Sequence, residues 1–308
     1  MSRLLILLVI ALGPGFVTAR STNQKAAQPN EPNPGEVRKV EISDKVFMEF
    51  CWIPAGEAQL GASKEEQDYI TNTFYDEKRP EWLNNETEAK RGKFKTKGFW
   101  LGKYTVTQEE WKAVMGGNPS VFAATGKYAD YRDKVKGLST LRFPVENVSW
   151  NDCQSFLSYV KSRTEAAGRA LGMAGKFVLP HEDEWEYACR GGKGNGRAFF
   201  WGSELNGTQA NCDGLYPYGT TTKGQYLGRT CAVDFTDGGK YEKHPWGLHH
   251  MHGNVWQYCG NIDEGKRILR GGSWFNFSRF CRASYRHWTY APEFPLDKGG
   301  FRVCFCPE

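Results

Sequence analysis

The alternation of hydrophobic and polar residues divides the chain into short predicted strands and helices. Val40 and Ile42 alternate with charged residues, and residues 46–53 are rich in β-forming side chains, which predicts two neighbouring strands. Residues 99–106 and 177–179 have the same β-forming character and predict two more. All four segments are short and are separated by long polar stretches.

Capping signals predict three helices. Thr107 and Ser149 are each followed three residues later by an acidic residue, which is the arrangement of a capping box. After Ser149, apolar residues recur at a spacing that places them on one helix face: Cys153, Phe156, Leu157 and Val160. A third helix is predicted after Pro180, where the acidic residues of 182–186 suit the positive end of a helix. We interpret those acids as complements of the helix dipole rather than as paired catalytic carboxylates.

The remaining segments show little periodicity. Residues 64–97 are charged, with irregularly spaced aromatics, and predict a surface excursion with some helix near its start. Residues 191–243 are rich in Gly, Thr, Asn and aromatic residues, which predicts turns. Residues 246–274 interleave glycines with large rings and predict an irregular core segment. With 11 Trp and 14% aromatic residues, the composition favours a loop-rich fold over a helical bundle.

The N-terminus has the pattern of a secretory signal. A charged start, an apolar run over residues 4–12 and a small-residue exit predict a signal peptide of residues 1–19, cleaved after Ala19. The apolar run is too short to span a membrane. Residues 20–36 are polar, contain prolines and predict a disordered linker, so that residues 37–308 form a single domain. We therefore expect a secreted or periplasmic protein without a transmembrane anchor in the mature chain.

Charge and cysteine usage narrow the functional classes further. The net charge of +5 comes from acids and bases that are mixed along the chain, which gives no reason to expect a nucleic-acid partner. Nine cysteines in an exported chain favour disulfides, but the odd number leaves at least one thiol without an intramolecular partner.

Seven ordered motifs carry a resemblance to a known family. They are Trp52-Ile53-Pro54-Ala55-Gly56, Tyr104-Thr105-Val106-Thr107-Gln108, Pro144-Val145 with Val148-Ser149-Trp150, Leu179-Pro180-His181-Glu182 with Glu184-Trp185-Glu186-Tyr187, Gly253-Asn254-Val255-Trp256, Arg270-Gly271-Gly272-Ser273-Trp274 and Gly300-Phe301-Arg302. In this order they resemble the formylglycine-generating enzyme, or sulfatase-modifying factor, family. The resemblance implies one α+β domain of C-type-lectin-like character, low in regular secondary structure.

In family members that make formylglycine, two cysteines bind copper(I) and activate oxygen against a substrate cysteine. Soft copper(I) requires such a thiolate pair. Here the matching window, residues 274–282, contains Cys281 as its one cysteine. The resemblance leaves two readings of Cys281: a catalytic cysteine, or the partner of Cys189 in the family's structural disulfide. With one sulfur in the window, we do not expect a copper site, and whether the protein is an oxidoreductase stays open.

The resemblance also implies a substrate cleft and calcium sites. The cleft residues that carry over are Asn254, Trp256, Ser273, Trp274 and Arg286. Their structural alternative is that the tryptophans are core rings, Asn254 ties a turn and Arg286 is a buried ion-pair partner. One calcium site would match Asn211 and Cys212, and a second would match Gly253, Val255 and Gln257, although carboxylate ligands are missing from both.

Three nearby histidines form a further candidate group. His249, His250 and His252 have a spacing at which imidazoles can converge on zinc or copper, or they can form the wall of a polar groove. No carboxylate supports them in the sequence, and Cys259 is the one thiol close by. We expect the groove wall.

These observations lead to one functional hypothesis and two alternatives. We expect an exported protein that binds or modifies a protein or peptide partner through the aromatic and polar cleft. A true formylglycine-generating oxidase, acting on a sulfatase cysteine, is the first alternative. A non-catalytic lectin-like module that recognises glycan or protein is the second.

Overall fold

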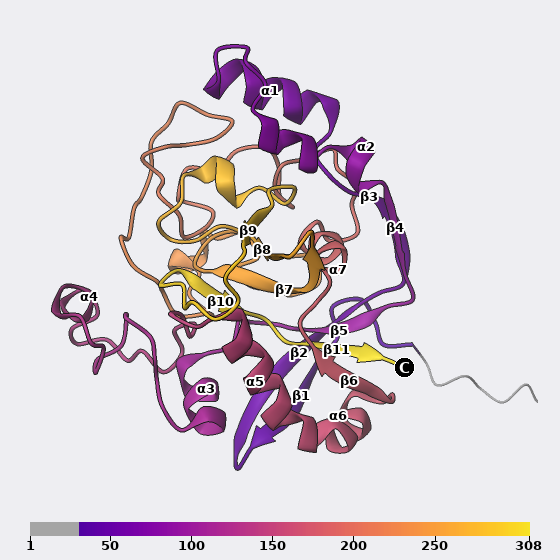
Figure 1. Ribbon diagram of the computed structural model, residues 1–308, viewed down its shortest axis with the longest axis vertical. Helices are drawn as coiled ribbons and strands as arrows, with labels where there is room; N and C mark the ends of the chain where they lie inside the picture. The colour runs from indigo at the N-terminus through magenta and orange to yellow at the C-terminus, as the bar shows by residue number, and fades with distance from the viewer. Residues whose placement is uncertain (1–30) are drawn as a thin grey trace, which may run out of the picture. The chain divides into compact units, whose positions relative to one another are not determined.

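Five antiparallel strands form the larger sheet, in the order β1-β2-β5-β11-β6 (Figure 1). They are β1 (Val37–Ser43), β2 (Val46–Ile53), β5 (Phe99–Gly102), β6 (Gly175–Val178) and β11 (Cys304–Pro307). The last strand of the chain, β11, lies between β5 and β6 and pairs with both, so it joins β6 to the rest of the sheet. The predicted strands are confirmed, although the one predicted over residues 99–106 ends at Gly102.

Helices cover one face of this sheet. They are α3 (Gln108–Met115), α5 (Trp150–Val160) and α6 (Thr164–Leu171), and they contact β1, β2 and β6. Both predicted capping boxes are present. The side chains of Thr107 and Ser149 accept the backbone N–H three residues later, and their own backbone N–H groups donate to the carboxylates of Glu110 and Asp152. The apolar face predicted for α5 is buried against Phe50, Phe177 and the rest of the core.

The opposite face of the sheet packs against α7 (Glu182–Cys189) and the loop that precedes β7 (Trp256–Asp263). Trp185 and Cys189 of α7 meet Phe99 and Leu101 of β5 in this second core. Loop residues complete it: Trp246, Leu248 and Met251. The predicted helix after Pro180 is therefore confirmed, and it stands between the sheet and the glycine-rich segment.

A second, four-stranded sheet has the order β10-β7-β8-β9. Its strands are β7 (Trp256–Asp263), β8 (Lys266–Arg270), β9 (His287–Thr289) and β10 (Gly299–Phe301). The prediction that residues 246–274 are irregular is wrong in its second half, because β7 and β8 form a hairpin there. Its turn uses Glu264 and Gly265 at φ 49° and 80°. A short turn with both central residues left-handed matches the twist of the paired strands.

The remaining elements are short. They are β3 (Gly56–Gln59), α1 (Lys64–Phe74), η1 (Glu81–Asn85), α2 (Glu88–Arg91), β4 (Lys93–Thr96), α4 (Ala129–Asp133), η2 (Lys161–Arg163), η3 (Asp237–Gly239) and η4 (Ser278–Cys281). The helix predicted near the start of residues 64–97 is α1. Between α7 and β7, η3 is the one regular turn, which confirms the prediction for residues 191–243.

The computed structural model describes residues 31–308, and from Pro32 onward they form one compact unit. The predicted signal peptide, its cleavage after Ala19 and most of the predicted linker lie outside the described residues. The end of that linker belongs to the domain instead: the backbone N–H of Gly35 donates to the Trp52 carbonyl, and the Trp52 N–H donates to the Glu36 carbonyl, both at 2.9 Å. No helix within residues 31–308 has the length and apolar composition to cross a membrane.

Candidate functional site

The loop after β8 passes directly over Cys281. Gly271 and Gly272 have φ angles of 94° and 74°, which residues with side chains rarely adopt. A Cβ atom at Gly272 would lie 2.4 Å from the Cys281 sulfur and 3.0 Å from its Cα. The two glycines are therefore needed for this loop to carry Ser273 and Trp274 past the cysteine.

Asn254 and Ser273, two of the predicted cleft residues, are fully buried and hold turns. Asn254 has a φ of 65°. Its Oδ1 accepts the Cys231 N–H at 3.0 Å and the Asn211 Nδ2 at 3.1 Å, while its Nδ2 donates to the Cys231 carbonyl at 3.1 Å. The Ser273 hydroxyl donates to the Asn276 Oδ1 at 2.6 Å. These hydrogen bonds occupy both side chains inside the domain.

Trp256 and Arg286 are also used internally. The Trp256 ring is 6% exposed and stacks on His287 with 5.0 Å between ring centroids. The Arg286 guanidinium donates to Glu182 at 2.6 Å and to Asp263 at 2.8 Å. Trp256 is thus a core ring and Arg286 a buried ion-pair partner.

Trp274 is the predicted cleft residue that lies under an exposed surface. It is 3% exposed, yet its indole N–H has no hydrogen-bond partner within residues 31–308. The rings of Phe275 and Tyr226, 52% and 36% exposed, lie 5.4 Å and 6.3 Å from it. The ammonium of Lys134 lies 5.7 Å from the Trp274 ring, and that of Lys298 lies 4.8 Å from the Phe275 ring. These five residues are called the Trp274 surface below.

The structure brings a second thiol to Cys281, and it is that of Cys212. The two side chains interact within one buried cluster, and this contact, together with burial, raises the pKa of the Cys281 thiol well above its usual value. The residues are 0% and 1% exposed. No pattern in the sequence indicates this contact, because Cys212 lies in the loop-rich segment before β7.

Cys189 faces His252 instead. The Cys189 sulfur lies 3.4 Å from the His252 Nε2, and the Nδ1 of the same ring lies 2.7 Å from the Cys281 carbonyl, which can only accept. Nδ1 therefore carries the proton and Nε2 accepts from the thiol. Burial raises the pKa of Cys189 to about 12 and lowers that of His252 to about 3, so the pair is uncharged at neutral pH. All nine cysteines are free thiols in this structure, and the Cys189–Cys281 disulfide stays a prediction.

The thiol pair of Cys212 and Cys281 differs from the copper site that the family resemblance implies. Two sulfurs suit copper(I), but active thiolates sit in electropositive, partly exposed surroundings. Here both sulfurs are enclosed by apolar side chains, with the Ser278 hydroxyl 3.5 Å from the Cys212 sulfur. A substrate cysteine has no approach to either atom, so these residues do not fit a copper site that acts on a peptide.

The second predicted calcium set, Gly253, Val255 and Gln257, does not fit calcium. The Gln257 Oε1 accepts the Trp185 indole N–H at 2.8 Å and the Arg302 Nε at 3.1 Å, and its Nε2 donates to the His250 carbonyl at 2.9 Å. The carboxamide is thus fully engaged, and a buried guanidinium stands at its oxygen. A divalent cation needs anionic oxygen ligands and would be repelled there.

The first predicted calcium set keeps one feature in its favour. The Asn211 Oδ1 is buried without a hydrogen-bond partner within residues 31–308. However, the neighbouring side chains are the thiol of Cys231 and the amide of Asn254, neither of which supplies charge. No group of three His, Cys, Asp or Glu that could hold a metal ion occurs in the described part of the chain.

The acids of α7 do more than complement the helix dipole. Glu186 is fully buried and accepts from Arg190 at 2.9 Å, from Arg270 at 2.5 Å and from the Gly61 N–H at 2.8 Å. Glu182 likewise binds Arg286. The sequence pattern alone could not show these ion pairs, because Arg270 of β8 and Arg286, just before β9, lie far along the chain from α7.

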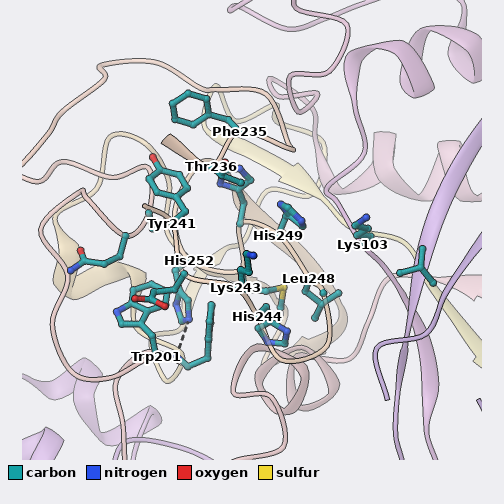
Figure 2. Close-up of a pocket in the computed structure, with 18 residues that line it drawn as sticks. Lys103, Trp201, Phe235, Thr236, Tyr241, Lys243, His244, Leu248, His249 and His252 are labelled. Atoms are coloured by element: carbon teal, nitrogen blue, oxygen red, sulfur yellow. Dashed lines mark hydrogen bonds between the residues drawn. The ribbon is translucent and has the colours of Figure 1, made fainter. Parts of the chain in front are cut away.

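A separate pocket lies beside the loop before β7. Its cavity volume is about 360 Å³, and its lining includes His244, His249, His250 and His252 (Figure 2). The groove wall predicted for the three neighbouring histidines is thus present. None of the five predicted cleft residues lines this pocket.

Comparison with known proteins decides the family. Residues 36–305 match the model of the sulfatase-modifying factor enzyme 1-like domain. The chain belongs to this sulfatase-modifying factor family. Two solved structures share the fold: Treponema denticola variable protein 1, with a TM-score of 0.58 and 22% identity over 88% of this chain and 99% of that one, and PvdO from Pseudomonas aeruginosa, with a TM-score of 0.58 and 19% identity over 90% and 100%.

Two relatives from the sulfatase-modifying factor family match part of the chain. The inactive C-alpha-formylglycine-generating enzyme 2 of Bos taurus is 30% identical over 141 residues, which are 44% of this chain and 40% of that protein. The formylglycine-generating enzyme of Streptomyces coelicolor is 29% identical over 160 residues, which are 45% and 44%. The match spans less than half of each relative.

Proposed function

We propose that this protein is an exported member of the sulfatase-modifying factor family that binds an extended segment of a protein partner at the Trp274 surface, without oxidising it. The supporting observation is the indole N–H of Trp274, which is buried and has no hydrogen-bond partner within residues 31–308. A buried donor without a partner costs about 1–3 kcal/mol. A backbone carbonyl of a bound peptide would supply the missing acceptor.

The neighbouring side chains suit such a segment. Exposed aromatic rings are frequent anchors of protein interfaces, because they bury a large area for little loss of conformational freedom. Phe275 and Tyr226 provide two rings beside the indole, and Lys134 and Lys298 hold cations against the rings. A peptide that places an apolar side chain on Phe275 would leave its backbone free to meet Trp274.

The absence of oxidation rests on the thiols. Formylglycine formation in this family needs a reactive thiolate pair, whereas Cys281 and Cys212 are enclosed in the core with a raised Cys281 pKa. One relative of this chain is named an inactive enzyme of this family, which is consistent with a binding role.

A displayed library of random peptides, selected on the protein, tests the proposal. Affinities of the selected peptides are then measured by fluorescence polarisation for the parent protein, Phe275→Ser and Trp274→Phe. We expect each variant to weaken binding at least about tenfold, since central aromatic residues carry interface energy. Trp288→Ser, which removes a 44%-exposed ring on β9, is the matched control and should leave the affinity unchanged. Peptides that bind Phe275→Ser as tightly as the parent would refute the assigned surface.

A further inference from the structure

The pocket of Figure 2 is distinct from the Trp274 surface. Phe235 and Tyr241 lie on one side of it, and His244 and Leu248 lie on the other. Trp201 completes the ring-lined wall. A cavity of about 360 Å³, lined in part by aromatic and imidazole rings, has the size of a site for a small molecule.

The interior of the pocket carries no net charge. Lys103 is paired with Glu49 at 2.9 Å, and Glu242 and Lys243 are exposed neighbours of opposite sign. The histidines add no charge at neutral pH, because burial lowers the pKa of His249 to about 4 and the pKa values of the other three to about 3. Arg302 lies behind this lining, and its guanidinium is held by the carbonyls of Gly102, Lys103 and His249. An ionic ligand would therefore lose its hydration without meeting a charged side chain of the lining that is free to pair with it.

One polar atom in the lining lacks a well-formed hydrogen bond. The Nε2 of His250 is buried and makes no hydrogen bond of normal geometry within residues 31–308, although the backbone carbonyls of Phe235 and Ala232 lie near the imidazole. The ring of Tyr241 lies 5.8 Å from that of His250, and the ring of His249 lies 6.5 Å from it, so aromatic rings flank this imidazole. Buried polar groups in folded proteins almost always have a partner, and here the pocket is the space from which one could come.

We propose that this pocket binds a small uncharged aromatic molecule that carries a hydroxyl or carbonyl group. Its ring packs between the aromatic walls formed by Phe235, Tyr241 and His244, and its oxygen bonds to the imidazole of His250. The ring–ring contacts supply most of the affinity, and the single hydrogen bond selects among ligands of similar shape.

Three probes with the same ring system test the chemistry on the unaltered protein: 2-naphthol, naphthalene and naphthalene-2-sulfonate. Binding is followed by isothermal titration calorimetry at pH 7.5. We expect 2-naphthol to bind at one site, about fivefold more tightly than naphthalene, which lacks the hydroxyl, because one hydrogen bond separates them. The sulfonate should bind at least about tenfold more weakly than 2-naphthol, because its charge must be desolvated. Sulfonate binding as tight as that of 2-naphthol would overturn the proposal.

Substitutions in the pocket test whether 2-naphthol binds there. Thr236→Trp puts a large ring into the pocket and should abolish 2-naphthol binding, whereas Trp288→Ser, on the exposed face of β9, should not change it. His250→Asn suits the left-handed backbone at φ 49° and should remove the preference for 2-naphthol over naphthalene. Thermal unfolding of each variant confirms that it folds. Unchanged 2-naphthol affinity in folded Thr236→Trp would refute the site, and the probes measured on the unaltered protein decide the chemistry if that variant does not fold.

Discussion

Replacing Glu186 by Gln tests the buried charges that hold α7 to the second sheet. The Glu186 carboxylate accepts hydrogen bonds from three groups: the guanidinium groups of Arg190 and Arg270 and the backbone N–H of Gly61. Glu186→Gln keeps the volume but removes the negative charge, and its amide N–H₂ would face a guanidinium. Two arginines that are 2% and 0% exposed would then lack their counter-ion.

The size of the effect follows from these contacts. Removing one partner of a buried ion pair costs about 3–5 kcal/mol, because the other charge stays buried without compensation. Both arginines keep hydrogen bonds to backbone carbonyls. Arg190 donates to those of Gly61 and Arg197, and Arg270 donates to those of Ser284 and Tyr285, so part of the cost of burying each charge is still offset. We therefore expect a loss of about 4 kcal/mol in the free energy of unfolding rather than the sum of two broken pairs.

Urea unfolding followed by circular dichroism measures this loss. The matched control is Glu57→Gln, which removes an exposed carboxylate 3.8 Å from the ammonium of Lys93. Exposed pairs of this kind contribute about 0–1 kcal/mol, so the control should unfold nearly as the parent does. A loss below about 1 kcal/mol in Glu186→Gln would refute the reasoning that the two arginines depend on this carboxylate.

Three further predictions concern stability and the thiols. Trp256→Ala should cost at least about 3 kcal/mol in urea unfolding, because the ring lies in the core; unchanged stability with lost partner binding would instead place it in a cleft. Burial alone would raise the pKa of Glu182, but the hydrogen bond and charges of neighbouring arginines lower it to about 2, so its stabilising contribution is present above about pH 4.5 and is lost as the pH falls toward 2. Unfolding at pH 7, 4.5 and 3 should show that loss in the parent and less of it in Arg286→Met; equal losses would contradict the assignment. The family resemblance implies that a non-reducing peptide map of exported protein joins Cys189 to Cys281, although the structure places Cys212 against Cys281; a map that joins Cys281 to Cys212 would overturn the implied pairing.

Local signals predicted much of the scaffold. The capping boxes at Thr107 and Ser149 fixed the starts of α3 and α5, because their side chains and the acids three residues on satisfy each other within one turn. The hairpin of β7 and β8 was missed. Its first residues, from Trp256 to Cys259, are all buried, so the period of two that marks a half-exposed strand is absent there.

The candidate site was less accessible to sequence reasoning. The family motifs pointed to Trp274, whose place in a cleft stays a prediction, and they could not choose between a cleft and a structural role for Asn254, Ser273 and Arg286. The partners of Asn254 and Arg286 lie far away in the sequence, as with Glu182 of α7 for Arg286, whereas Ser273 bonds to Asn276 within its own loop. The contact of Cys212 with Cys281 is likewise a product of tertiary packing, which spacing along the chain cannot show.

The most direct test of the central claim, binding without oxidation, is mass spectrometry of a peptide that contains Cys-x-Pro-x-Arg. The peptide is incubated in air with the reduced, copper(I)-loaded protein, and its cysteine is followed over time. Because the Cys212 and Cys281 thiols are enclosed, we expect the peptide to keep its cysteine unconverted to formylglycine. Formylglycine that appears with the parent protein and disappears in Cys281→Ser would contradict the account and identify a formylglycine-generating oxidase.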